Sequence, residues 1–331
     1  MPTHRVFGAG LIGGYLAGAL LACGESVSVV ARGPARDRLA HGLRLTDLEG
    51  HEAKVPAPRF FATGEPPPDF LWLTVKCTQV ADAVASLPPH VGPETVLICC
   101  QNGLGSEEPV RKQFPEHTVL RAMVAFNVAE PGNGHLHRGS GGTLTIEHDE
   151  RLSAFVATVD RPLMPVELSR DIEAVQWAKL QLNLVNAINA LADVPVREML
   201  HQRGYRRAFA AAMRELLAVS AALGLRLPQL TKLPARLLPG MLSLPDGLFR
   251  LLARPMLEVD PTVRTSMWWD LSQGKPTEIG FLNGAVVGAG RRLGVPTPVN
   301  ERVLALVRSV EQGDRRNGLS PNELLQALGL E

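Results

Sequence analysis

The stretch RVFGAGLIGGYLAG, residues 5–18, joins a short strand pattern, a glycine cluster and the start of a helical pattern. Gly8 permits a tight turn, Gly10 has no Cβ and lets the backbone approach a pyrophosphate, and Gly13 lets helix and strand pack closely. A helix N-terminus then presents free N–H groups and a positive dipole end to phosphates. The stretch therefore predicts a dinucleotide-binding turn formed by Gly8, Gly10, Leu11, Ile12 and Gly13.

The rest of the first half repeats this alternation of strand and helix. Strands are predicted at residues 5–7, 26–31, 70–75, 95–100, 118–124 and 142–146. Short apolar strands separated by helices are typical of a parallel sheet that is covered on both faces. This pattern predicts an α/β domain of the Rossmann type over residues 1–168.

Past about residue 168 the pattern becomes helical. Helices are predicted at residues 172–192, 205–223, 276–293, 300–312 and 321–328. Residues 232–261 are rich in Leu, Pro and Arg, and they predict broken short helices that line or cover a cleft. An all-α domain is therefore expected over residues 169–331.

Composition excludes several functional classes. A chain of 331 residues is long enough for two domains. Its formal net charge of +1 gives no field that would attract nucleic acid or an anionic membrane. The four cysteines show no Cys-x-x-Cys spacing, so neither a metal site nor a disulfide framework is predicted. Buried thiols in a reducing cytoplasm are the simpler interpretation.

The N-terminal residues 1–23 allow a second interpretation. They carry His4 and Arg5, then an apolar stretch that ends Leu-Leu-Ala-Cys at Cys23, as in a bacterial lipoprotein signal. The strand–turn–helix interpretation is favoured because the same residues also satisfy the more demanding glycine pattern. No other segment is long and apolar enough to span a bilayer, and we expect a cytoplasmic protein.

The end of the second predicted strand discriminates between cofactors. A site that prefers NAD usually places Asp or Glu there to bind the ribose 2′-hydroxyl. Here the strand ends in Arg32, and Arg36 follows one helical turn later. A guanidinium can bind a 2′-phosphate in a bidentate fork. Arg32 could instead be a solvated loop residue, but its position and the absence of an acid favour NADP, used as NADPH.

Two later strands also end in polar residues. Lys76 follows one strand, and Asn102 follows the next in the run Gln-Asn-Gly-Leu-Gly. Ligands of open α/β sheets bind outside the carboxyl ends of the strands, so Asn102 is placed to face a nicotinamide. An ordinary Asn-Gly turn and a solvated lysine are the alternatives.

Two polar groups stand out in the second half. Lys179, Asn183 and Asn186 are spaced i, i+4 and i+7, so they share one face of a largely apolar predicted helix. Asparagine is a poor helix former, and this stripe indicates a cleft more than a solvated surface. Ser266 and Glu278 follow later; alone, they could be a helix cap and a carboxylate at a helix N-terminus.

Taken in order, these segments resemble the ketopantoate reductase (2-dehydropantoate 2-reductase) family over nearly the whole chain. The resemblance implies an NADP-dependent oxidoreductase that reduces ketopantoate to pantoate in pantothenate biosynthesis. It implies Lys179 as the general acid and Glu278 as a carboxylate that orients the substrate. It further implies that Lys76 lies near the nicotinamide and that Asn102, Asn183 and Ser266 contact the substrate. We also expect Asn186 to contact the substrate, and Asn102 and Glu278 to contact the cofactor.

The chain also departs from the family pattern. Many members have an asparagine where this chain has Ala187, and another where it has Val263. These changes concern the substrate, so reduction of a different oxo acid is the first alternative. A non-catalytic NADP-binding sensor is the second, although it would have no need of Lys179 and Glu278. The family also suggests that the helical domain, residues 169–331, binds the substrate and forms a homodimer contact.

His135 and His137 alternate as on a strand, and we expect both side chains to be exposed there.

Overall fold

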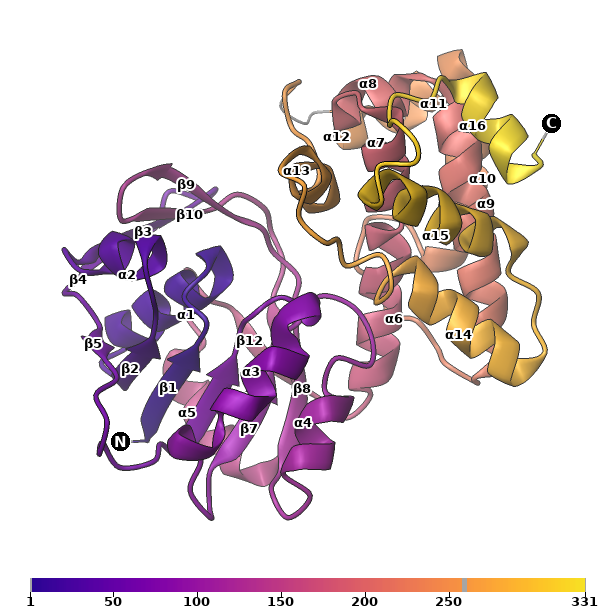
Figure 1. Ribbon diagram of the computed structural model, residues 1–331. Coiled ribbons are helices and arrows are strands. Elements are labelled where there is room, and N and C mark those ends of the chain that lie inside the picture. Colours follow the sequence, from indigo (N-terminus) through magenta and orange to yellow (C-terminus); the bar gives the residue numbers. More distant parts are fainter. Residues whose placement is uncertain (1, 258–260, 331) are drawn as a thin grey trace. The chain divides into compact units, whose positions relative to one another are not determined.

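The residues directly ahead of the glycine cluster form β1, an interior strand of an eight-stranded sheet. The computed structural model describes residues 2–257 and 261–330, and the chain divides into two compact units, Met1–Ile172 and Glu173–Glu331 (Figure 1). In the first unit the sheet has the order β12-β11-β8-β7-β6-β1-β2-β5. Its strands are β1 (Thr3–Phe7), β2 (Ser26–Val30), β5 (Arg59–Phe60), β6 (Phe70–Leu73), β7 (Val96–Cys99), β8 (Val119–Val124), β11 (Leu144–Glu147) and β12 (Val166–Ser169).

The strands from β5 to β8 are parallel, as predicted. At the other edge the prediction of an all-parallel sheet was wrong, because β11 pairs antiparallel with β8. The chain between these two strands leaves the sheet and comes back in the opposite direction. An antiparallel return of this kind needs no crossover helix.

Helices cover both faces of this sheet. The helices of the unit are α1 (Leu11–Ala22), α2 (Pro34–Leu39), α3 (Val80–Ser86), α4 (Glu108–Gln113) and α5 (Glu150–Val159), with short 3-10 turns η1 (Cys77–Gln79) and η2 (Pro88–His90). Trp72 packs with α1 and α5 on one face, whereas its neighbour Leu71 packs with α3 and α4 on the other. The strand–turn–helix interpretation of the N-terminal stretch is thus confirmed for residues 3–22.

A second sheet of four strands was not predicted. It has the order β4-β3-β10-β9 and consists of β3 (Leu43–Asp47), β4 (Glu52–Val55), β9 (Val128–Gly132) and β10 (His135–Arg138). Helix α1 lies close against it, because a Cβ added at Gly18 would come within 3.0 Å of Leu45. His135 and His137 lie on a strand, as expected, but they are half-buried and each contacts the Thr46 hydroxyl at 2.8 Å.

The second unit is helical among its described residues. Its helices are α6 (Ile172–Asn183), α7 (Val185–Ala192), α8 (Val196–His201), α9 (Arg203–Ala222), α10 (Leu238–Ser243), α11 (Asp246–Leu252), α12 (Arg254–Leu257), α13 (Ser266–Ser272), α14 (Asn283–Leu293), α15 (Pro298–Glu311) and α16 (Pro321–Leu328), with a 3-10 turn η3 (Ala235–Leu237). The long helix α9 packs against α10, α14, α15 and α16. Broken helices in residues 232–261 are confirmed, except for residues 258–260, which lie outside the described residues.

Two predicted helices are corrected. The helix expected over residues 172–192 is two helices, which are separated at Leu184. The helix expected from residue 276 begins only at Asn283, because side chains hold the preceding residues in a turn. No helix of the described residues has both the length and the apolar character needed to cross a membrane.

Candidate active site

The three glycines of the turn after β1 have three different surroundings. Gly8 has φ +105°, a region that L side chains rarely adopt. A Cβ on Gly13 would fall 1.9 Å from the Gly8 carbonyl oxygen and 2.5 Å from Thr74 Oγ1. A Cβ on Gly10 would meet no atom within 4 Å. Gly8 and Gly13 therefore serve the fold, whereas the lack of a side chain at Gly10 leaves open space beside the backbone.

The N-terminus of α1 lies at this open space. Gly10 is the residue that caps the helix, and the first intrahelical bond runs from Gly14 N to Gly10 O at 2.8 Å. The amides of Leu11, Ile12 and Gly13 precede that bond, so the helix itself offers them no acceptor. Such amides, together with the positive end of the helix dipole, form an anion-binding site.

A hollow of about 250 Å³ lies at the carboxyl end of β2. Its lining is Val29, Val30, Ala31, Arg32, Arg36, Phe60, Phe61 and His90. The Arg36 guanidinium lies over the Phe60 ring, 4.6 Å from its centroid. Burial and the nearby Arg5 and Arg32 cations lower the pKa of His90 to about 4, so this ring is neutral near pH 7. The hollow thus combines aromatic walls with arginine charge.

The segments that carry Lys76 and Asn102 are joined at the carboxyl ends of β6 and β7. The Gln101 side-chain amide donates to Leu73 O at 2.7 Å and to Val75 O at 3.2 Å. The Cys77 thiol donates to Asn102 O at 3.0 Å. Lys76 itself is exposed at the start of η1. The structure therefore brings these two predicted residues into one loop cluster beside the strand that ends at the glycine turn.

The positioning residues of this cluster were not among the predicted site residues. Thr74 Oγ1 donates to Phe7 O at 3.2 Å and also to Gly8 O, which ties the end of β6 to the glycine turn. Gln101 was noted only as part of the run around Asn102. Thr74 and Gln101 share one feature that could have predicted their role. Each is a polar residue just after a buried strand, where its side chain can bond to the end of the neighbouring strand.

The remaining candidates belong to the helical unit. Lys179 is half-buried on α6, and burial lowers the pKa of its ammonium below the ordinary value of 10.5. Asn183 is the last residue of α6, whereas Asn186 lies on α7, past the break at Leu184. Lys179 and Asn183 thus keep the predicted i, i+4 relation. The expectation that one uninterrupted helix carries Lys179, Asn183 and Asn186 was wrong.

Asn186 and Ser266 come together through the residue before the serine. Thr265 Oγ1 donates to Asn186 O at 3.3 Å, and Thr265 N donates to Asn189 Oδ1 at 3.1 Å. Asn189 is fully buried and also donates to Val194 O at 2.7 Å. It therefore holds the start of α13 against α7. Thr265 caps α13, and Ser266 is the first residue of that helix, so the interpretation of Ser266 as the cap is corrected by one position.

A second contact between α7 and α13 lies beside this one. Asp193 ends α7 with φ 54°, and its carboxylate accepts from Arg264 Nη1 at 3.1 Å and from Trp268 Nε1 at 2.5 Å. The Arg264 guanidinium stacks on the Trp268 ring at 4.1 Å. Ala187, one of the departures from the family pattern, is fully buried on α7. In this chain the asparagine of α7 that contacts the Ser266 segment through its side chain is Asn189.

Glu278 lies in the turn that precedes α14. Thr277 N donates to the Glu311 carboxylate at 2.7 Å, and the amides of Phe281 and Leu282 donate to Glu278 O. The Glu278 side chain is half-buried. The interpretation of Glu278 as a carboxylate in the first turn of a helix was wrong, because α14 begins five residues later at Asn283.

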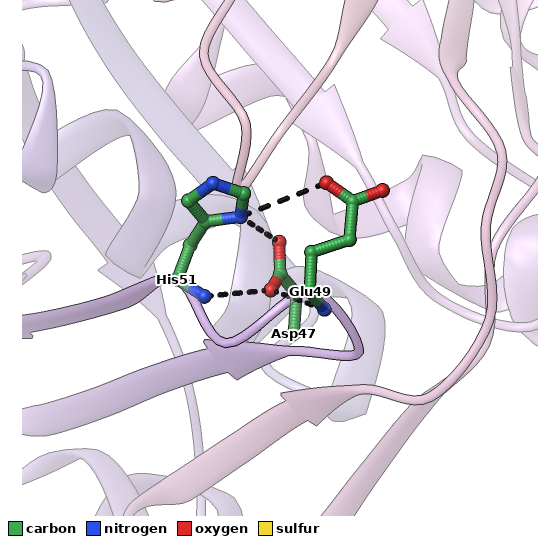
Figure 2. Close-up of side chains that lie close together, drawn as sticks. All are labelled: Asp47, Glu49 and His51. Atoms are coloured by element: carbon green, nitrogen blue, oxygen red, sulfur yellow. Dashed lines mark hydrogen bonds and ion pairs between the residues drawn. The ribbon is translucent and has the colours of Figure 1, made fainter.

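Three side chains of the β3–β4 hairpin, Asp47, Glu49 and His51, lie close enough to raise the question of a metal site (Figure 2). The buried Asp47 carboxylate already accepts from Glu49 N, His51 N and His51 Nδ1 at 2.9 Å each, and from Arg138 Nη2 at 3.0 Å. Burial opposes ionisation of Asp47, but these bonds outweigh it and lower its pKa to about 2. The group stabilises the hairpin and its contact with β10.

An open glycine turn after a strand of a largely parallel sheet is typical of a dinucleotide-binding protein, and here a helical unit follows that sheet in the chain. Comparison with known proteins then identifies the family. The family described as "Ketopantoate reductase PanE/ApbA" matches residues 5–150, and its C-terminal part matches residues 171–311. The chain belongs to the ketopantoate reductase family, and it is an NAD(P)-dependent oxidoreductase of that type.

Relatives and solved structures agree with this assignment. A 2-dehydropantoate 2-reductase of Archaeoglobus fulgidus is 30% identical over 317 residues, covering 93% of this chain and 98% of the relative. The enzyme of Mesorhizobium japonicum is 30% identical over 340 residues, with the same coverage. A ketopantoate reductase of Ralstonia eutropha has a TM-score of 0.76 and 27% identity over 95% of this chain and 100% of its own.

A further solved structure shares the fold alone. D-mandelate dehydrogenase with NADH and anilino(oxo)acetate has a TM-score of 0.73 at 19% identity, covering 94% of this chain and 99% of its own. The resemblance stated from the sequence and the predicted fold class are confirmed.

Proposed function

We propose that the chain reduces a 2-oxo acid with NADPH, and that this acid is 2-dehydropantoate, which becomes pantoate in pantothenate biosynthesis. The observation that carries the proposal is Lys179, a half-buried lysine of lowered pKa in a chain of this family. A non-catalytic sensor would have no use for such a group. Perturbed lysines are typical of sites that transfer protons.

The geometry of the N-terminal unit supports NADPH as the cofactor. Gly10 leaves room for a pyrophosphate, and the amides of residues 11–13 can bind its oxygens. Arg32 and Arg36 line a hollow with aromatic walls, a donor set that suits a 2′-phosphate beside an adenine ring. Lys76 and Asn102 follow strands at the same edge of the sheet, where a nicotinamide would be expected. Bound NADPH would supply the hydride.

The chain's own residues would supply the proton and hold the substrate. Hydride addition to a ketone builds negative charge on the carbonyl oxygen. The Lys179 ammonium would stabilise that charge and then donate its proton. Asn102, Asn183, Asn186 and Ser266 would bind the substrate with neutral donors, and Glu278 would orient its hydroxyl and contact the cofactor. We propose that residues 1–168 bind the cofactor and residues 169–331 the substrate.

The test is NADPH oxidation by the purified protein, followed at saturating cofactor with a panel of 2-oxo acids. The panel contains ketopantoate and phenylglyoxylate, the latter because a structural relative is D-mandelate dehydrogenase. We expect the highest kcat/KM with ketopantoate. If only another acid is turned over rapidly, that acid would replace ketopantoate as the proposed substrate, and the proposed reaction type would stand. Tight NADPH binding without turnover of any acid would favour the sensor.

Arg32 gives a separate test of the cofactor. We expect Arg32→Gln to raise the KM for NADPH by about tenfold or more, because a charge-assisted fork to phosphate is lost, and to leave the KM for NADH unchanged. Arg44→Gln is the matched control, since Arg44 pairs with Glu52 on the other sheet. Equal effects of Arg32→Gln on both cofactors would contradict a 2′-phosphate contact.

A further inference from the structure

The helical unit has a second hollow, of about 230 Å³, lined mainly by one face of α9. Its lining is Arg203, Arg207, Ala211, Arg214, Ser243 and Leu330. The three arginines are spaced i, i+4 and i+11, so they project from the same side of the helix. None of these residues is among the candidates for cofactor or substrate binding.

Each guanidinium of the hollow is held on one side by an acceptor of the protein. Arg203 Nε donates to Ser243 O at 3.1 Å, and Arg207 Nη2 donates to Leu330 O at 2.8 Å. Arg214 Nη2 donates to Ser243 Oγ at 2.7 Å. A guanidinium has five N–H donors in a rigid fork, so each retains further donors. These anchors reduce the rotamer freedom that a ligand would otherwise have to restrict.

The positive charge of this face is not balanced within the described part of the chain. No carboxylate of residues 2–257 or 261–330 forms an ion pair with Arg203, Arg207 or Arg214. Their neighbour Arg206 differs, because it is fully buried, pairs with Asp246 at 2.9 Å and stacks on the Phe249 ring. Arg206 therefore has a structural role that the other three do not share.

The helix itself makes the charges of Arg203 and Arg207 unfavourable. Helix α9 begins at Arg203 and has no acidic residue in its first turn. Cations near a helix N-terminus oppose the helix dipole, and like charges at i, i+4 repel. The nearby Glu215 does not compensate, because its carboxylate accepts from Val299 N and Asn300 N. A bound anion would relieve both the repulsion and the opposition to the dipole.

We propose that the hollow between α9, α10 and Leu330 binds a small phosphorylated anion, as a site separate from the cofactor turn. Guanidinium forks match phosphate oxygens in a bidentate geometry. Three of them suit a diphosphate better than a single carboxylate. Ala211 and Leu330 form the apolar part of the wall, and the small volume of the hollow suits a compact phosphate or phosphate ester.

Isothermal titration of the full chain with inorganic pyrophosphate tests the proposal. The protein is first saturated with NADP⁺, which keeps the probe away from the glycine turn and Arg32. We expect one binding event, which Arg207→Gln weakens by about tenfold or more because a charged fork is lost. Arg207→Lys keeps the charge but loses the bidentate fork, so its affinity for pyrophosphate should lie between those of the parent and Arg207→Gln. The control Arg226→Gln changes an exposed arginine outside the hollow and should bind like the parent.

Several outcomes would overturn the site. They are no heat of binding in the parent protein, equal affinity in Arg207→Gln and the parent, loss of the event in Arg32→Gln, or equal affinity for acetate and pyrophosphate. Inorganic phosphate, titrated in parallel, identifies a single phosphoryl group if it binds as tightly as pyrophosphate, and a diphosphate if it binds more weakly. If Arg207→Gln does not fold, Arg214→Gln takes its place, with the parent's unfolding midpoint as the criterion of folding.

Discussion

Gly8, Gly10 and Gly13 belong to one motif, yet the structure gives each a different requirement. The positive φ of Gly8 and the crowding at Gly13 are demands of the fold, since a side chain at Gly13 would collide with Gly8 O. Gly10 meets no such obstacle. A motif that looks uniform in the sequence therefore divides into two residues that the fold requires and one, Gly10, on which the fold places no such steric demand.

This division predicts opposite effects of two alanine substitutions. Gly13→Ala should lower the unfolding free energy by several kcal/mol, at the upper end of point mutations, because the backbone must move. Gly10→Ala should leave thermal unfolding unchanged and weaken NADPH binding about tenfold or more. Differential scanning calorimetry and NADPH fluorescence titration separate the two. A large loss of stability in Gly10→Ala would contradict an open space at this position.

Lys179 is half-buried, whereas the role of general acid proposed for it requires a protonated amine. Burial favours the neutral amine, and this lowers the pKa of Lys179 from 10.5. The ammonium is then lost at a lower pH than in a free lysine. A rate that requires the ammonium falls as the pH rises through the lowered pKa.

For a general acid we expect kcat to fall on the alkaline side with an apparent pKa below 10.5. Lys179→Ala should remove this limb, cut kcat at least about a hundredfold and leave NADPH binding nearly intact. The exposed Lys275→Ala is the control. Near-normal turnover in Lys179→Ala would remove Lys179 from the mechanism.

At the scale of elements, polar side chains decide where strands and helices end and which elements they contact. The break between α6 and α7 separates Asn183 from Asn186, and the buried Asn189 then binds the Thr265 segment to α7. The β3–β4 hairpin is organised in the same way by Asp47. The Asp47 carboxylate accepts three hydrogen bonds within the hairpin and a fourth from Arg138 of β10. It therefore joins two segments of the second sheet that are distant in the sequence.

Asp47 and Glu49 form a matched pair for testing this hairpin. Asp47→Asn leaves the buried Arg138 without its anion, and removal of one partner of a buried ion pair costs about 3–5 kcal/mol. Glu49→Gln changes an exposed carboxylate and should alter stability by less than about 0.5 kcal/mol. Urea unfolding at pH 7 measures both. Equal stabilities of the two variants would contradict the assigned role of Asp47.

At the scale of the whole molecule, buried histidines make stability depend on pH. Burial lowers the pKa of His4 to about 4, against an opposing effect of Asp69, and the pKa of His90 also falls to about 4. The unfolded chain binds these protons near pH 6.5, whereas the native protein binds them only near pH 4. The unfolding free energy must therefore decrease as the pH falls through this window.

We expect a stability loss on the order of 3 kcal/mol for His4 alone between these limits. Urea unfolding at pH 7 and at pH 5 would show the part of this loss that develops above pH 5. His90→Phe, which keeps an aromatic ring beside Phe7 and Phe61, should reduce the difference between the two pH values. The exposed His41→Gln should leave it unchanged. A difference that is identical in the parent and His90→Phe would contradict a neutral, buried His90.

Much of this architecture was predictable because its causes are local. Glycine φ preferences, apolar runs and helical periodicity lie within short windows, and they are enough to predict the fold class, the parallel strands and the family resemblance. The helix predicted from residue 276 failed because Thr277 N bonds to Glu311, a contact that no local pattern contains. The cytoplasmic location and the homodimer stay predictions.

The sequence by itself determined the glycine turn, the six strands that it predicted in the larger sheet and the candidates that follow them, since each depends on neighbours in the chain. Only the tertiary structure decided which side chains meet. Thr46 contacts His137 across 91 positions, Thr74 reaches the Gly8 carbonyl across 66, and Asn189 holds Thr265 across 76. Contacts of this kind arise from packing of distant segments, whose free energy depends on burial in the folded chain and leaves no periodic trace in the sequence.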